Sequence, residues 1–143
     1  MKIKLIGLYQ LITGIFGFIL IAVNISKIFK SFDVIYTFLI GLLLFAGLAF
    51  AGYALLNSYK NAAKYSILAQ AMQIISFTAG SVQYLFSGSA FLFIQYNDGF
   101  SFKYQIEPIA YNISGVSDLF PLELRIFIVP ILLVILLVFE KKS

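Results

Sequence analysis

The chain has 143 residues, of which 62% are hydrophobic and 11% are charged, and its formal net charge is +4. A soluble domain carries about 25% charged residues, so this composition excludes a surface that faces water on all sides and favours an integral membrane protein. Histidine and cysteine are both absent, which excludes disulfides, haem ligation by either residue and a Ser-His dyad. We therefore expect no metal and no other cofactor.

The first predicted membrane span covers residues 5–24, which is long enough for a helix of about 20 apolar residues. We expect a retained helix, because the run exceeds a signal h-region and no A-x-A-like cleavage site follows it. Gly7, Gln10, Gly14 and Gly17 recur at steps of three and four, so they share one face. This pattern indicates a packing seam; a face that lines a ligand is the alternative.

The second predicted span covers residues 34–56 and has a similar stripe. Gly47, Ala51 and Ala54 recur at steps of four and three, with Gly52 beside them. Small residues let the backbones of two helices approach closely in lipid. We therefore expect the first two spans to dock as a tight hairpin.

The third predicted span, residues 62–86, is unusually polar. Unpaired amides in hydrocarbon cost several kcal/mol, so its polar face is expected to point into the bundle. That face either bonds to neighbouring helices or lines a pocket for a neutral or lipid-like molecule. Residues 85–96 are also apolar, so in an alternative reading the third span runs later along the chain, with Gly88 inside it, and the hairpin is shorter. The candidate ligand-binding residues are Gln70, Gln73, Ser76, Gln83 and Tyr84.

Residues 87–120 form the predicted outer loop. Residues 90–96 and 100–106 read as two strands, and Asn97-Asp98-Gly99 between them is a strong hairpin-turn signal. The hairpin is interpreted either as a lid over the helices or as an edge that binds a partner by strand addition. The candidate partner-binding residues are its aromatic side chains, Tyr96, Phe100, Phe102 and Tyr104.

The fourth predicted span covers residues 122–139. Pro130 falls in its middle and is expected to kink the helix, because proline removes a backbone hydrogen bond. Arg125 lies near the start, where it acts either as a headgroup anchor or as an ion-pair partner of a nearby acid. With four spans both termini lie on one side, which holds six basic residues against four. The positive-inside rule places that side in the cytoplasm, and we expect a bacterial inner membrane.

Together these elements predict an all-α, single-domain membrane protein over residues 1–143, built as a four-transmembrane-helix bundle with a small extracytoplasmic β-hairpin between helices 3 and 4. The predicted function is a non-enzymatic interaction or accessory subunit that acts through its outer loop. Its expected partners are membrane lipids and a membrane or extracytoplasmic protein. A homo-oligomer is an alternative, and no nucleic-acid partner is expected. The alternative is a binding or transport bundle for a neutral or lipid-like molecule. A third reading is an interfacial lipid enzyme that uses Glu107, Asp118, Glu123 and Arg125.

Overall fold

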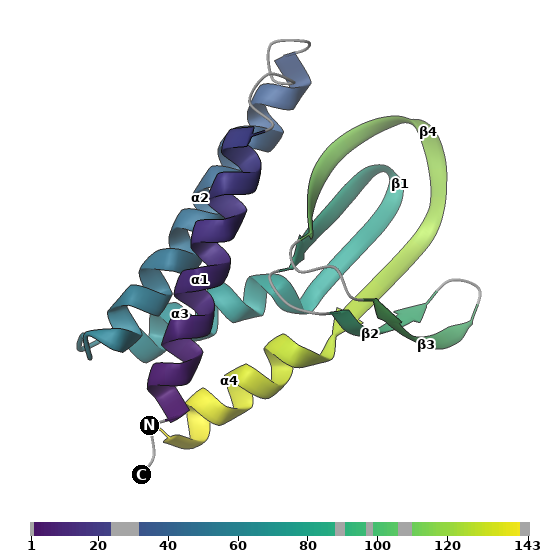
Figure 1. Cartoon of the computed structure of the whole chain (residues 1–143). Helices are drawn as coiled ribbons and strands as arrows, with labels where there is room; N and C mark the ends of the chain where they lie inside the picture. The colour runs from purple at the N-terminus through teal and green to yellow at the C-terminus, as the bar shows by residue number, and fades with distance from the viewer. Residues whose placement is uncertain (1, 24–31, 88–90, 97–98, 106–109, 141–143) are drawn as a thin grey trace.

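The computed structural model describes residues 2–23, 32–87, 91–96, 99–105 and 110–140 (Figure 1). These ranges contain four helices and a small antiparallel sheet. The elements in chain order are α1 Lys2–Val23, α2 Phe32–Leu56, α3 Ala62–Ile74, β1 Ile75–Ser87, β2 Phe91–Tyr96, β3 Phe100–Gln105, β4 Ala110–Phe127 and α4 Ile128–Glu140.

Helices α1 and α2 pack side by side as an antiparallel pair (Figure 1). A Cβ atom added at Gly14 would lie 2.5 Å from the backbone nitrogen of Ala49. Gly52 of α2 meets the backbone of α1 just as closely, at Leu11. Only glycine permits such an approach of two backbones, so the predicted seam between the first two helices is confirmed at these positions.

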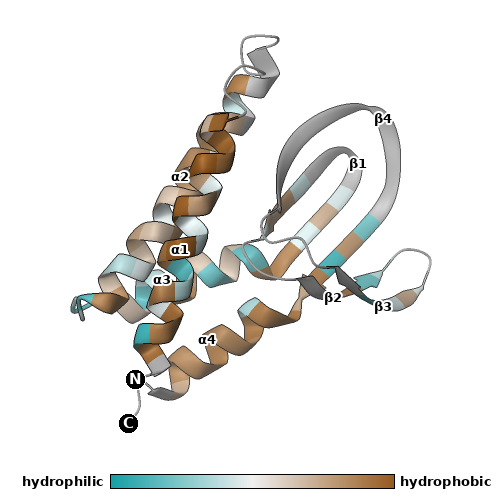
Figure 2. Cartoon of the chain, in the orientation of Figure 1, coloured by the Kyte–Doolittle hydropathy of each residue, from teal (hydrophilic) through white to brown (hydrophobic). Residues whose placement is uncertain are grey.

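Helices α1 and α2 consist mainly of hydrophobic residues (Figure 2), and many of their large apolar side chains are exposed. Leu5 of α1 is 60% exposed and Leu43 of α2 is 72% exposed. The segments Ile3–Val23 and Phe38–Leu56 are both long and apolar enough to cross a membrane. Of the four predicted spans, therefore, two are supported by helices of sufficient length in the described residues.

The predicted third span is wrong, because the helix stops halfway. Helix α3 ends at Ile74 and the chain continues directly as strand β1. The change of structure falls at Ile74-Ile75-Ser76-Phe77-Thr78, where β-branched and aromatic residues favour an extended backbone. With 13 residues, α3 is about 20 Å long, which is too short to span a bilayer.

The predicted fourth span is wrong for the same reason. Residues up to Phe127 belong to strand β4, and helix α4 has only 13 residues. Pro130 therefore stands in the first turn of α4 and not in mid-helix. In a first turn the missing N–H has no helical partner to lose, so the predicted kink does not arise. The sheet also makes the predicted all-α class wrong.

The predicted β-hairpin is confirmed: β2 pairs antiparallel with β3, and Tyr96 faces Phe100 across the turn. The turn residues Asn97 and Asp98 lie outside the described residues, as do the predicted strand ends at 90 and 106. The full strand order is β1-β4-β2-β3, which the sequence did not predict. Strands β1 and β4 pair from Ile75↔Ile126 to Ser87↔Ala110 and arch over together, with breaks in register on both sides of Gly80 (Figure 1).

The sheet is attached to the side of the helical hairpin (Figure 1). Phe86 near the end of β1 packs edge-on against Phe45 of α2, with ring centroids 5.2 Å apart. Ile21 and Leu48 complete this cluster. A second cluster contains residues from all four helices. Its members are Ile6 of α1, Ala54 and Leu55 of α2, Ala62 of α3 and Leu137 of α4.

Candidate functional site

The buried face of α3 carries the polar residues that the sequence placed together. Ser66, Gln70 and Gln73 are all fully buried. The Ser66 hydroxyl donates to Oε1 of Gln10 at 2.8 Å, and Nε2 of Gln10 donates weakly to the Ser66 carbonyl at 3.5 Å. These two residues link α1 to α3, so this part of the face acts as a contact between helices.

Gln70 differs from its neighbours on this face. Neither atom of its amide has a hydrogen-bond partner among the described residues, although both are shielded from solvent. Gln73, one turn further on, donates from Nε2 to the carbonyl of Ala69 at 3.2 Å. A buried amide without a partner is unfavourable, so Gln70 is a weak point of the packing between helices.

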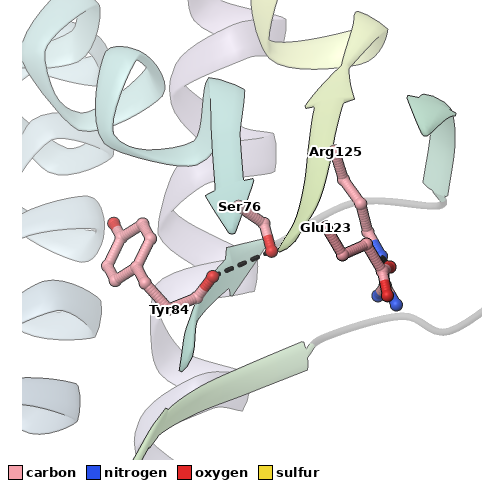
Figure 3. A network of polar contacts seen from close by, with 4 residues as sticks. All are labelled: Ser76, Tyr84, Glu123 and Arg125. Atoms are coloured by element: carbon pink, nitrogen blue, oxygen red, sulfur yellow. Dashed lines mark hydrogen bonds and ion pairs between the residues drawn. The ribbon is translucent and has the colours of Figure 1, made fainter. Parts of the chain in front are cut away.

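The remaining candidate ligand residues lie on β1, because the helix ends before them. The Ser76 hydroxyl donates to the carbonyl of Tyr84 at 2.8 Å and so joins the two limbs of the β1 arch (Figure 3). The Tyr84 hydroxyl donates to the carbonyl of Met72 at 2.8 Å, in the last turn of α3. Burial raises the pKa of Tyr84 above its usual 10.0. The side chain of Gln83 lies outside the described residues.

The candidate set thus separates into two groups with different roles. Gln70 and Gln73 are buried on helix α3, whereas Ser76 and Tyr84 hold the arch of β1 to itself and to α3. The sequence pattern could not separate them, since the grouping assumed one continuous helix through position 84. We find no single polar pocket that these described residues line together.

A groove that the sequence did not reveal lies on the neighbouring face of α3. It runs between α2 and α3 and has a volume of about 310 Å³. Its lining is predominantly apolar. The lining residues are Leu43, Leu44, Gly47, Leu48, Phe50, Tyr65, Leu68, Ala69, Met72 and Phe86. The residue that could have indicated it is Gly47. The sequence pattern places Gly47 in the seam, but a Cβ atom added there would meet no described atom within 4 Å, so the predicted seam is wrong at this position.

The β2–β3 hairpin carries the candidate partner-binding residues. Phe100 is 83% exposed and its ring lies 5.1 Å from that of Tyr96. Strand β3 is the last in the sheet order, so one of its two edges has no strand beside it among the described residues. Ser101 and Lys103 on this strand are exposed. The side chains of Phe102 and Tyr104 lie outside the described residues.

Two of the four residues that the lipid-enzyme hypothesis names, Glu123 and Arg125, form a local ion pair. Glu123 and Arg125 are two residues apart on β4 and contact each other directly (Figure 3). The Arg125 guanidinium also lies 5.5 Å from the centre of the Phe93 ring. The side chains of Glu107 and Asp118 lie outside the described residues. The described residues contain no group of three acids that could hold a metal ion.

The chain matches no protein-family model, and it has no significant match among curated proteins or among solved structures. Its function is therefore argued from its own surfaces.

Proposed function

We propose that this protein is a membrane-anchored interaction protein: the α1–α2 hairpin lies in the bilayer, and strand β3 binds an extended segment of a protein partner. The observation that carries the proposal is the open edge of β3 together with the 83% exposure of Phe100. An open edge supplies unpaired backbone N–H and C=O groups, and an exposed aromatic ring beside it supplies an anchor.

The membrane anchor is supported by the pattern of burial in the helical hairpin. Its backbones meet at Gly14 and Gly52, while large apolar residues such as Leu5 and Leu43 point outward. A helix in the core of a soluble protein buries such residues, because exposing them to water is unfavourable. Lipid solvates them without that penalty, and the close seam supplies the packing that holds two helices together there.

The position of the sheet supports a protein partner. Phe86 attaches β1 to α2 at Phe45, well within the hairpin. Because an open sheet edge is not stable against hydrocarbon, a sheet beside a membrane hairpin requires water or protein at its free edges, which belong to β1 and β3 among the described strands. Strand β3 is on the side of the sheet away from the helices (Figure 1), where a partner strand has access.

The proposed orientation places the start of α1 and the α2–α3 turn on the cytoplasmic face of a bacterial inner membrane. Lys4, Lys60 and Lys64 are exposed at this end, and basic residues are enriched on the cytoplasmic side. In this arrangement α1 and α2 are the two spans, and both termini share the cytoplasmic side. A membrane-impermeant thiol reagent tests this directly with a cysteine at position 60, since the natural chain has none.

The partner is tested by photo-crosslinking in cells. A benzophenone side chain at Ser101 or Lys103 of β3 is expected to capture a discrete partner, whereas the same group at exposed Asn57 is not. Phe100→Lys is expected to abolish the capture from position 101. The matched control is Phe139→Lys, an equally drastic change at a residue that is 67% exposed on α4. Capture that is independent of position, or that yields only a second copy of this chain, contradicts the proposal.

A further inference from the structure

The groove between α2 and α3 is open because one of its walls is a bare backbone. A Cβ atom added at Gly47 would meet no described atom within 4 Å, whereas one at Gly14 would run into Ala49. The two glycines therefore have opposite surroundings. The groove volume of about 310 Å³ lies at the lower limit of pockets that bind small molecules, which is about 300 Å³.

We propose that this groove holds one acyl chain of an anionic phospholipid, with the lipid phosphate at Lys60 and Lys64. The walls suit an alkyl chain: Leu43, Leu68 and Met72 offer only apolar atoms. Burial of an alkyl chain against such walls needs no hydrogen-bond partner, so the shortage of polar groups in the groove is no obstacle. The inference rests on the membrane location in the proposed function and is independent of the partner at β3.

One end of the groove carries the side chains expected at a membrane surface. The rings of Phe50 and Tyr65 lie 5.5 Å apart at the groove wall. The rings of Tyr53 and Tyr59 lie 5.9 Å apart, close by in the chain. Tyrosine is enriched at the headgroup level, where its ring is buried and its hydroxyl is wet. This end of the groove is therefore assigned to the interface.

The charges at this end complement an anionic headgroup. Lys64 precedes Leu68 by one helical turn and shares its face of α3, and Lys60 lies in the turn just before the helix. Both side chains are exposed, and neither forms an ion pair within the described part of the chain. From there the groove continues along α3 to Met72 and Phe86. A lipid seated with its phosphate at the lysines thus has its chain directed along the groove.

The test uses the full-length protein in vesicles that contain an anionic phospholipid with a diazirine in one acyl chain. Vesicle flotation first shows that the protein is in the bilayer. Mass spectrometry then gives the ratio of labelling at groove residues Leu68 and Met72 to labelling at Leu5 and Ile12 on the outer face of α1. The same experiment with a zwitterionic probe measures the headgroup preference.

Gly47→Leu fills the groove and is expected to abolish the excess labelling at Leu68 and Met72. The control Ala46→Leu also introduces a leucine, at an exposed neighbour outside the groove lining, and leaves the excess labelling unchanged. Lys64→Gln is expected to lower the preference for the anionic probe about fivefold, and Lys4→Gln leaves it unchanged. A labelling ratio that is the same in Gly47→Leu as in the natural protein overturns the inference. Failure to float contradicts the membrane location itself, so the two failures are distinguishable.

Discussion

The unpaired amide of Gln70 gives the sharpest prediction for stability. Both polar atoms of this side chain are buried, and neither has a partner among the described residues. A buried amide left without a hydrogen bond costs about 1–3 kcal/mol. Leucine has a similar size and no polar atom, so Gln70→Leu is expected to raise the free energy of unfolding by about the same amount.

Gln10→Leu is the matched comparison, because Gln10 lies in the same group of polar residues and does have partners. It accepts from the Ser66 hydroxyl at 2.8 Å, and both residues are fully buried. A hydrogen bond between membrane helices contributes about 0.6 kcal/mol on average. Removing the Gln10 amide also leaves the Ser66 hydroxyl without its acceptor. The free energy of unfolding of this variant is therefore expected to fall by about 1 kcal/mol in total.

The assay is a denaturant titration of both variants in the same detergent micelles. The expected difference between them is about 2–4 kcal/mol, with opposite signs relative to the natural protein. If Gln70→Leu is destabilised as much as Gln10→Leu, then the Gln70 amide takes part in a hydrogen bond that stabilises the fold. The assignment of Gln70 as the weak point of this face would then be wrong.

Three further outcomes are expected. Gly14→Ala should lower the free energy of unfolding by about 1–3 kcal/mol, because the new methyl group would lie 2.5 Å from the Ala49 backbone; an unchanged titration midpoint contradicts the close seam. Ser58→Gly should raise the free energy of unfolding by about 1 kcal/mol, because Ser58 follows α2 with a left-handed φ of 57°. The control, Ser58→Ala, should give no gain in stability. Tyr84→Phe removes the hydrogen bond to the Met72 carbonyl and should lower the free energy of unfolding by about 1 kcal/mol. Since burial raises the pKa of Tyr84 above 10.0, its contribution is full below pH 10 and is lost as the pH rises through the raised pKa; stability that falls equally in the phenylalanine variant would contradict this assignment.

The sequence was sufficient for the elements whose pattern is local. The glycine steps of α1 predicted a seam, and Gly14 indeed touches the backbone of α2. The dipeptide Asp98-Gly99 and the alternation after it predicted the hairpin of β2 and β3. In both cases the residues that carry the signal are close in sequence and act on their own backbone or on the next element.

The predictions of the third and fourth spans were wrong because long apolar stretches were assumed to be helical throughout. Ile75, Phe77 and Thr78 are as apolar or as small as a membrane helix requires, yet they favour a strand. Strand β1 is stabilised by a pairing with β4 that joins residues far apart in sequence, such as Ile75 and Ile126. An apolar stretch of about 20 residues contains only one of the two strands, so its hydrophobicity does not distinguish a strand pair from two helices.

The candidate site shows a related limit of sequence patterns. Helical spacing tells which residues share a face, but it does not tell what covers that face. Gly14 and Gly47 occur in similar stripes of small residues, and one is closed by Ala49 while the other borders a groove. The larger side chains of Leu68 and Met72 on α3 line the same groove as Gly47, and a Cβ atom added at Gly47 would meet no described atom within 4 Å. A stripe of small residues therefore brings two backbones together only where the facing helix also presents a small residue, as Ala49 does at Gly14.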